Sequence, residues 1–267
     1  MLYVCTRSYK LSGFSRYALF AALLLSLNLF TSCEMFAAVA PVKSSVPPMT
    51  LSQVVDTLVA RNMERARDLR SYQGRRTYTL VYRGFPGDLH ATMAVDMNYE
   101  APNTKEFKVT SQSGPKWLVD RVLKRLVKTE SDAQQDETRK AVDLNENNYN
   151  FSDLEYQPAA DSCSYVVTVE PKTPNKYLYR GKIWINDNDF AVCRIQAQPA
   201  KNPSFWITST SIHETYKKVG EFWLPEENKS VSRIRFGGSA TLTIQYQDYK
   251  VQAQPLAGVG GSLSSGS

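Results

Sequence analysis

The strongest constraint on the fold of this chain is the regular alternation of apolar residues with polar or small ones in several separate stretches. Met93, Val95 and Met97 alternate with smaller or polar neighbours, and the stretch 240–247 follows the same pattern. Successive side chains of a strand point to opposite faces of its sheet, so a period of two predicts strands with one buried face. Strand and helix patterns do not alternate regularly, which argues against a parallel sheet.

The whole chain predicts about ten strands and two substantial helices. The first helix is expected over 51–70, where Thr50 and Gln53 form a candidate capping box. The second begins at Gly114 and Pro115 and carries a wide apolar arc. We therefore expect a mainly β (α+β) fold. A large antiparallel sheet would curl into an unclosed β-barrel, with the two helices covering its open side.

The stretch 176–207 contains the clearest turn signal. Asn186–Asp189 follows an aromatic and β-branched run, and Asn and Asp tolerate turn dihedrals, so we expect a four-residue loop that pairs Ile185 with Phe190. Ile183 and Ile185 would lie on one face of this hairpin. The opposite face would carry Arg180, Lys182 and Trp184, and the mixed alternation leaves open which face looks into a cavity.

Four segments of different composition organise the chain. They are a signal peptide with a candidate lipobox (1–33), a linker (34–49), a single β-domain (50–252) and a disordered tail (253–267). Basic residues precede the apolar run 17–30, which is short for a membrane span. Cys33 after Phe30-Thr31-Ser32 predicts lipidation, whereas Ala38-Val39-Ala40 is a competing cleavage site that Pro41 disfavours. Either site predicts export to the cell envelope, in the periplasm, with a membrane anchor in the first case.

Charge gives little indication of a partner. The formal net charge is +6, and three of the charges lie in the leader, so no nucleic-acid partner is expected. One basic cluster lies opposite the apolar arc of the second helix, namely Arg121, Lys124, Arg125 and Lys128. Such a face can lie on an anionic membrane, and it is also common on a helix that simply covers a core. The membrane surface is thus a candidate partner, through this face and a lipid on Cys33.

Cys163 and Cys193 are the two cysteines outside the leader segment. Export permits a disulfide between them. If strand 163–170 pairs with 177–184, and 190–198 pairs with the other side of that strand, a whole strand separates the cysteines. Two ladder steps span about 9.5 Å, more than the roughly 7 Å that a disulfide bridges. We therefore expect two small buried thiols.

The familiar catalytic and metal-binding patterns are missing from the sequence. His90 and His213 lie far apart, and neither cysteine has a histidine partner at a recognisable spacing. Asp187 and Asp189 are explained by turn formation. We expect a protein without enzymatic activity, cofactor or metal, and a hydrolase with unrecognised residues is the alternative.

Aromatic and methionine side chains are the candidate binding residues. Methionine and tyrosine suit an adaptable apolar pocket, because the thioether repacks around variable ligands. The alternation predicts these lipid-binding residues: Tyr78, Leu80, Tyr82, Met93, Val95, Met97, Tyr99, Phe107, Ile234, Phe236, Leu242 and Ile244. The alternative is that each of them is an ordinary core residue.

The order of these elements resembles the outer-membrane lipoprotein-sorting (LolA-like) family of bacterial periplasmic proteins. The stretches that carry the resemblance are Tyr177–Ile185 with Asp189–Ala191, Pro199–Trp206 and Gly220–Pro225, and the likeness extends over about Thr50 to Val251. It implies an unclosed β-barrel, capped by helices, that holds lipoprotein acyl chains in an apolar cavity. No functional residue of the family maps onto a single position of this chain.

Two functions follow as expectations. The first is an exported, non-enzymatic protein that binds acyl chains or lipoproteins in an apolar cavity, in outer-membrane lipoprotein sorting. A lipid anchor on Cys33 would suit a resident receptor better than a freely diffusing carrier. The alternative is a periplasmic protein-interaction or envelope-stress sensor domain whose core is filled by its own side chains. The sequence leaves the physiological ligand and the oligomeric state open.

Overall fold

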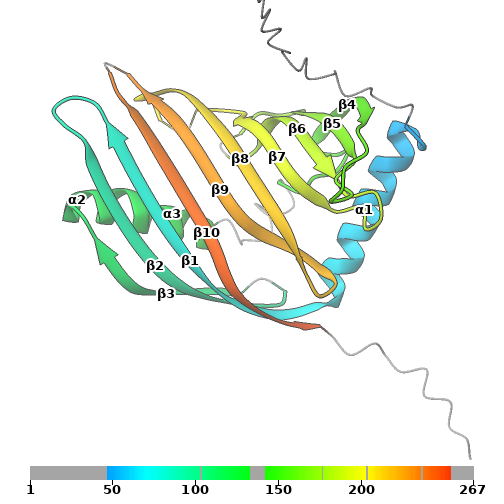
Figure 1. The fold of residues 1–267 in the computed structure, drawn as a ribbon, viewed down its shortest axis with the longest axis horizontal. Helices are drawn as coiled ribbons and strands as arrows, with labels where there is room; N and C mark the ends of the chain where they lie inside the picture. The colour runs from blue at the N-terminus through cyan, green and yellow to red at the C-terminus, as the bar shows by residue number, and fades with distance from the viewer. Residues whose placement is uncertain are drawn as a thin grey trace, which may run out of the picture. The chain divides into compact units, whose positions relative to one another are not determined.

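The computed structural model describes residues 47–102, 104–132, 142–175, 177–202, 204–235 and 237–253 (Figure 1). The chain divides into two units, 1–41 and 42–267, and all described residues belong to the second. The predicted signal peptide with Cys33, most of the linker and nearly all of the tail lie outside the described residues. Among the helices of the described part, none has the length and apolar character that crossing a membrane requires.

In the described residues, ten antiparallel strands form one sheet in the order β3-β2-β1-β10-β9-β8-β7-β6-β5-β4. The strands in the first half of the chain are β1 (Leu69–Arg83), β2 (Leu89–Glu100), β3 (Thr104–Ser113), β4 (Tyr149–Tyr156) and β5 (Tyr165–Pro171). Those in the second half are β6 (Tyr179–Ile185), β7 (Val192–Pro199), β8 (Ile207–Val219), β9 (Phe222–Ile234) and β10 (Ser239–Ala253). Strands β3 and β4 are the two edges and do not pair with each other, so the sheet is not closed. The predicted fold class is confirmed.

The two predicted helices are present. Helix α1 (Leu51–Asp68) begins at the expected capping box, in which Thr50 and Gln53 satisfy each other's backbone N–H groups. It ends two residues before the predicted boundary, because β1 starts directly at Leu69. The second helix runs through α2 (Lys116–Leu118), a wide π-turn η1 (Val119–Leu123) and α3 (Lys124–Asp132).

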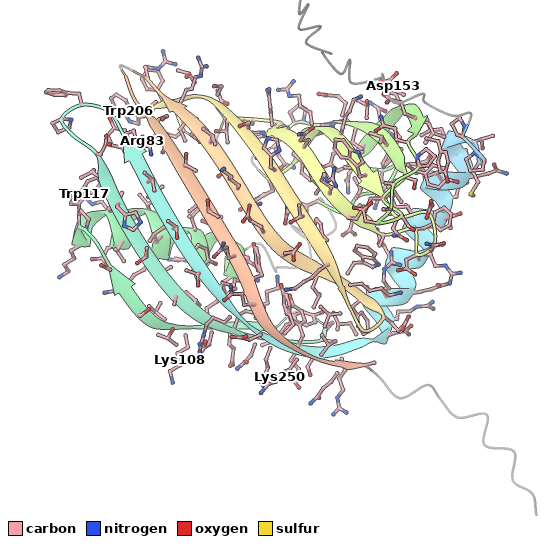
Figure 2. The ribbon with its side chains drawn as sticks, viewed as in Figure 1. Arg83, Lys108, Trp117, Asp153, Trp206 and Lys250 are labelled. Atoms are coloured by element: carbon pink, nitrogen blue, oxygen red, sulfur yellow. A yellow bond between two sulfur atoms is a disulfide. The ribbon has the colours of Figure 1, made fainter. Side chains whose placement is uncertain are left out.

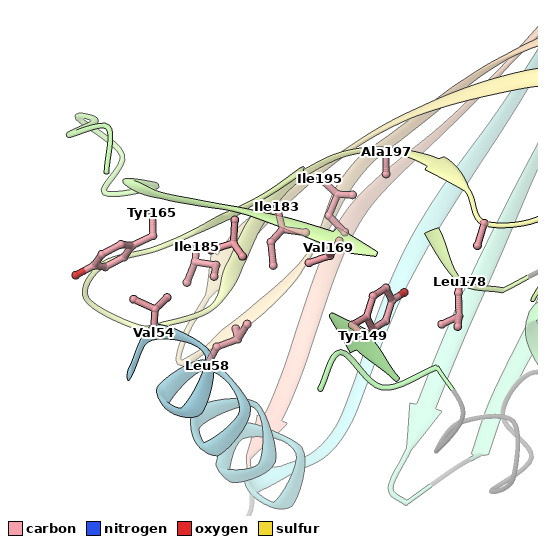
Figure 3. Close-up of a cluster of buried hydrophobic side chains, with 12 residues drawn as sticks. Val54, Leu58, Tyr149, Tyr165, Val169, Leu178, Ile183, Ile185, Ile195 and Ala197 are labelled. Carbon is pink, nitrogen blue, oxygen red and sulfur yellow. The ribbon is translucent and has the colours of Figure 1, made fainter. Parts of the chain in front are cut away.

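One face of the sheet packs against both helices, and we call it the inner face. Residues directly opposite in neighbouring strands share a face, so the face can be followed through the register from β2 to β5: Met93, Tyr78, Ile244, Asn228, Glu214, Ile195, Ile183 and Val167. Val54 and Leu58 of α1 bury the β5–β7 part (Figure 3). Leu118, Val119 and Leu123 bury the β1–β2 part. Ile183 and Ile185 therefore point inward, which answers the question that the sequence left open.

The hairpin between β6 and β7 differs from the prediction. Ile185 pairs with Val192 rather than with Phe190, and the loop is wider than four residues. The Asn186 side chain accepts hydrogen bonds from the backbone N–H groups of Asn188 and Asp189, at 3.0 and 2.8 Å. This local turn leaves Phe190 with a positive φ of 48° and outside the ladder. The side-chain hydrogen bonds of Asn186 therefore outweigh the expected strand pairing.

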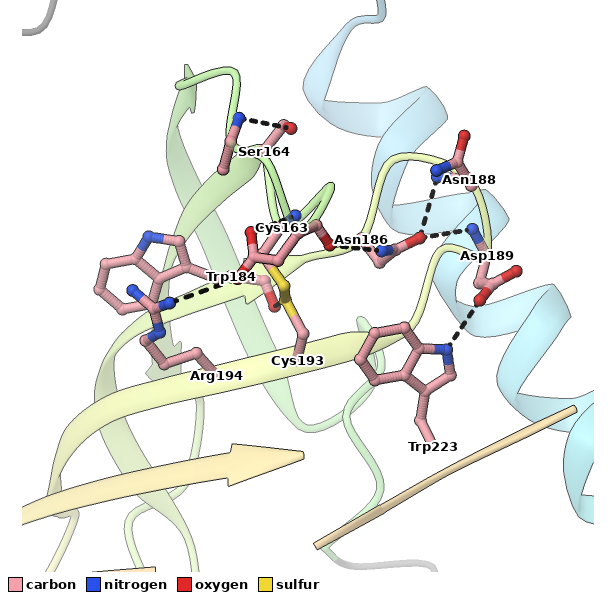
Figure 4. The surroundings of a disulfide bond; sticks show 11 residues. Cys163, Ser164, Trp184, Asn186, Asn188, Asp189, Cys193, Arg194 and Trp223 are labelled. Carbon is pink, nitrogen blue, oxygen red and sulfur yellow. Dashed lines mark hydrogen bonds and ion pairs between the residues drawn. A yellow bond between two sulfur atoms is a disulfide. The ribbon is translucent and has the colours of Figure 1, made fainter. Parts of the chain in front are cut away.

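The prediction that Cys163 and Cys193 remain separate thiols is wrong, because they form a disulfide (Figure 4). Their Cα atoms lie 6.2 Å apart, within bridging range. Cys163 precedes β5, and Tyr165 pairs with Ile185, the last residue of β6. The chain at Cys163 therefore passes beyond the end of β6, and Ser162 accepts a hydrogen bond from the N–H of Asp187 there. The assumed full strand between the cysteines ends too early to separate them.

Removing this disulfide is expected to destabilise the fold without changing it. The bond closes a loop with a sequence separation of 30 residues, and the chain-entropy model assigns about 3.6 kcal/mol to a loop of that size. The double variant Cys163→Ser/Cys193→Ser should lose about this much unfolding free energy in urea. Wild-type protein under reducing conditions is the matched control and should lose the same amount. Unchanged stability in both samples would contradict the assignment.

Candidate functional site

Two helices cannot cover the whole inner face. Ten strands at about 4.8 Å spacing make a sheet about 43 Å wide, whereas each helix is about 10 Å across. In the described part of the chain, the helix-packed apolar clusters lie over β4–β7 on one side and over β1, β2 and β10 on the other. Of the central strands β8 and β9, only Tyr216 packs against one of these two clusters.

The centre of the inner face carries polar side chains. We define a polar strip on β8 and β9 by residues Thr210, Glu214, Asn228, Ser230 and Ser232, which share the inner face by register with one apolar residue, Ile212. Thr210 and Ser232 are hydrogen-bonded to each other at 2.8 Å. Thr210 is buried and the other four are half-buried. The alternation of β8 and β9 therefore places polar groups where the apolar clusters end.

Glu214 is the unusual member of the polar strip. Burial raises the pKa of its carboxyl to about 7, against the opposing effect of hydrogen bonds from Tyr216 and Asn228. The negative charge of Glu130 adds to the rise, and the positive charge of Arg76 opposes it. Near neutral pH, a carboxyl in this state exchanges a proton readily.

A charged cluster joins the second helix to the sheet. Arg76 of β1 is 4 % exposed and donates to the carboxylate of Glu130 on α3. Lys105 of β3 donates to the other oxygen of Glu130 at 3.1 Å. The Arg76 guanidinium also lies over the rings of Phe107 and Tyr246, at 5.3 and 5.0 Å. Burial alone would raise the pKa of Glu130, but the two cations lower it, so the carboxylate stays charged.

A pocket of about 650 Å³ lies beside the C-terminal half of α1. Its wall on α1 is formed by Val59, Asn62, Met63, Ala66 and Arg67. Its opposite wall is formed by Tyr99 at the end of β2, Ala101 and Pro102 in the β2–β3 turn, and the segment Asp143–Asn145. We call this the α1 pocket. Its volume falls within the range of small-molecule sites, and apolar side chains line both walls.

The predicted lipid-binding residues that the structure describes all lie on the inner face, but they differ in access. Tyr78, Met93, Val95 and Met97 are at most 1 % exposed and pack in the core, and Leu80 is nearly as buried. Those that remain half-buried are Tyr82, Tyr99, Phe107, Ile234, Leu242 and Ile244. Tyr99 also lines the α1 pocket. Phe236 lies outside the described residues.

The described residues contain no group of three or more His, Cys, Asp or Glu side chains that could hold a metal ion.

The basic residues Arg121, Lys124, Arg125 and Lys128 are exposed, as predicted for a solvated helix face. Lys124 is paired with Asp120 at 2.7 Å.

Sequence reasoning missed the polar centre and the α1 pocket. The sequence does contain a sign that Arg76 is unusual. The alternation in β1 assigns Arg76 to the buried face, and a buried arginine requires an acidic partner. The partner, Glu130, is 54 residues away and could not be identified from the pattern. The pocket depends on the approach of α1 to two distant segments, and no local pattern encodes that approach.

Removing only the acidic member of the charged cluster is expected to destabilise the protein. Glu130→Gln leaves the buried Arg76 without a counter-charge and should lower the unfolding free energy by about 3 kcal/mol. Arg76→Met/Glu130→Leu removes both charges and should recover most of that loss, because the surroundings of Arg76 are largely apolar. Urea unfolding of the wild type, Glu130→Gln and the double variant would measure the effect. A double variant less stable than Glu130→Gln would contradict the assignment.

Glu214 is expected to make stability depend on pH. Its pKa of about 7 in the folded chain lies above its ordinary value of 4.5. Between these values the unfolded chain has lost the proton while the folded chain keeps it, so stability should fall as pH rises through this window. Glu214→Gln should remove about 2 kcal/mol of this decrease between pH 5 and pH 8, measured by urea unfolding. An identical pH dependence in wild type and variant would contradict the raised pKa.

Comparison with known proteins gives structural likenesses alone. No family model matches the chain, and no curated protein matches its sequence. A DUF1329 family protein from Desulfovibrio piger is similar over 75 % of this chain and 92 % of its own, at 10 % identity and a TM-score of 0.39.

Two further structures are similar over nearly the same region. A LolA superfamily protein from Nitrosomonas europaea matches 75 % of this chain and 94 % of its own, at 10 % identity and a TM-score of 0.32. A putative outer membrane lipoprotein-sorting protein domain from Vibrio parahaemolyticus matches 76 % and 95 %, at 13 % identity and a TM-score of 0.33. These likenesses are distant. The unclosed sheet with helices against one face is established by the strand order and the helix contacts themselves.

Proposed function

We propose that this chain is an exported, non-enzymatic protein that binds the apolar chain of a lipid or lipoprotein in the α1 pocket. The observation that carries the proposal is the pocket itself, about 650 Å³ with apolar groups from Val59, Met63, Ala66 and Tyr99 on facing walls. An acyl chain has no polar groups to satisfy, so a slot lined by such side chains suits it. Arg67 and Asn62 at the same pocket could meet a polar headgroup.

The α1 pocket is a better candidate for the binding site than the space around the predicted methionine and valine residues, because those residues are buried. Met93 and Val95 pack between the sheet and the second helix, and Met97 packs against Phe222 and Leu224, so a ligand could reach them only by displacing packed side chains. Met63 at the α1 pocket is instead 61 % exposed. A flexible thioether at a pocket mouth adapts to chains of different length.

The disulfide supports location in the cell envelope. Disulfides persist in oxidising compartments such as the periplasm and are rare in the cytosol. The bond between Cys163 and Cys193 therefore agrees with export by the leader 1–33. Lipidation of Cys33 remains part of the proposal and would keep the chain on a membrane.

The filled core favours a second candidate. Four of the predicted binding residues are almost completely buried by their own neighbours, as expected for a protein-interaction or envelope-stress sensor domain that needs no ligand. Such a domain would show no saturable acyl binding. It would also yield a specific envelope protein on cross-linking in cells.

Filling the α1 pocket should weaken acyl binding. Ala66 lines the pocket but is exposed, so Ala66→Trp adds a bulky ring to the pocket without disturbing the core. We expect the variant to raise the Kd for a fluorescent fatty acid at least tenfold, equivalent to about 1.4 kcal/mol. Fluorescence titration of the full chain measures the change.

Ala60→Trp is the matched control, because Ala60 is exposed on the same helix and does not line the pocket. It should bind the probe like the wild type. Equal affinity in the two variants would show that the α1 pocket is not the site. Absence of saturable binding in the wild type would overturn the proposed function and favour the second candidate.

A further inference from the structure

Four large apolar side chains project into solvent from loops and the start of the second helix. Phe85 is 89 % exposed, Trp117 53 %, Phe205 68 % and Trp206 58 %. Single exposed apolar residues are common, but aromatic residues gathered at one place mark an interaction surface. Whether these four lie together is decided by the strand register.

The register places all four at the same end of the sheet. Arg83 pairs with Ser239, so the turn that holds Phe85 lies beside the β9–β10 turn. Ile207 pairs with Ile234, which brings Phe205 and Trp206 to that same turn. Figure 2 shows Arg83, Trp117 and Trp206 toward one end of the sheet, with Lys250 toward the other.

Hydrogen bonds and a cation–π contact connect the residues at this end of the sheet. Arg235 in the β9–β10 turn donates its backbone N–H to Trp206 O at 2.7 Å and its Nε to Phe205 O at 3.1 Å. Its guanidinium lies 4.3 Å from the centre of the Phe205 ring. A Cβ atom on Gly114 would lie 2.8 Å from the Cα atom of Ala91, so the backbone three residues before Trp117 closely approaches the start of β2. We call this end, with its four aromatic residues, the aromatic rim.

The charge around the aromatic rim is mainly positive. The segments 83–90, 113–121, 199–207 and 232–240 contain two carboxylates, Asp88 and Asp120. The same segments contain six cations, namely Arg83, Lys116, Arg121, Lys201, Arg233 and Arg235. All six cations are exposed, and Asp120 is already paired with Lys124.

We propose that the aromatic rim docks on the surface of a bilayer that contains anionic phospholipid. Tryptophan and phenylalanine partition into the boundary between headgroups and acyl chains, and flanking arginine and lysine attract anionic headgroups. The excess of cations over carboxylates fits such a surface better than an uncharged one. This surface shares Arg121 with the helix face Arg121–Lys128 but is otherwise distinct from it, and it does not require a lipid on Cys33. It lies at the opposite end of the sheet from the α1 pocket, so docking does not depend on acyl binding.

The tryptophans allow a direct test on the full chain. The chain has four, and none lies in the leader 1–33. Trp184→Phe/Trp223→Phe leaves only the two rim tryptophans. Trp117→Phe/Trp206→Phe leaves Trp184 and Trp223. These two pair with Arg194 and Lys218 and lie next to the β6–β7 and β8–β9 turns, at the other end of the sheet.

Each variant is mixed with vesicles of brominated phosphatidylcholine and phosphatidylglycerol in equal parts. The rim tryptophans should lose about half of their emission and the other pair about a tenth, because bromine quenches only the rings that reach the acyl boundary. Equal quenching of the two pairs would overturn the proposal, even if the leader brings the chain to the vesicle.

Two further variants test the chemistry of the surface. Phe85→Ser/Phe205→Ser removes exposed rings, so it should keep the fold while lowering vesicle partition at least about tenfold. Arg83→Gln/Lys201→Gln should lower it about tenfold on the anionic vesicles and have no effect on pure phosphatidylcholine. Raising the salt from about 0.1 M to about 1 M should weaken anionic binding, since the screening length falls from about 10 Å to about 3 Å. Equal binding to both vesicle types would refute the anionic preference.

Discussion

The apolar inner face of the sheet is wider than the two helices that pack on it, and most features of the structure follow from this mismatch. Leu118, Val119 and Leu123 bury one side of the face, and Val54 and Leu58 bury the other. Burial of an apolar face is what makes a large sheet stable in water, so strands without a helix over them need polar side chains instead. The polar strip on β8 and β9 meets this need in the centre of the sheet.

The two helices are held in different ways. Arg65 of α1 donates to the backbone carbonyls of Asp189 and Phe190, at 2.8 and 2.9 Å, and thereby ties the helix to the β6–β7 turn. In the same part of the sheet, the disulfide joins Cys163, just before β5, to Cys193 of β7. The second helix depends on Glu130 between Arg76 and Lys105. A buried ion pair of this kind adds little net stability, but it fixes one position of the helix, because any other position would leave Arg76 without a counter-charge.

The sequence predicted those features that depend on local patterns. Alternation around Met93–Met97 and Ala240–Tyr246 identified strands and their buried face, and Thr50 and Gln53 identified the start of α1. Prediction failed where distant segments meet. The disulfide depends on how far β6 extends beside Cys163. The wider hairpin was missed for a different reason, because it depends on local hydrogen bonds of the Asn186 side chain that compete with strand pairing. The α1 pocket requires the approach of α1 to the β2–β3 turn, which no periodicity reports. Twelve candidate binding residues were named from alternation alone, which cannot separate a core position from a ligand-lining one.

An apolar chain bound in the α1 pocket would lie between α1 and the β2–β3 turn. Photolabelling can locate it there: a fatty acid with a photoactivatable diazirine near the end of its chain is bound to the full protein and irradiated, and the labelled residues are mapped by peptide mass spectrometry. We predict label within Val59–Arg67 and Tyr99–Pro102, which form the facing walls of the pocket. Label confined to the leader, to the aromatic rim, or to no defined position would contradict this prediction.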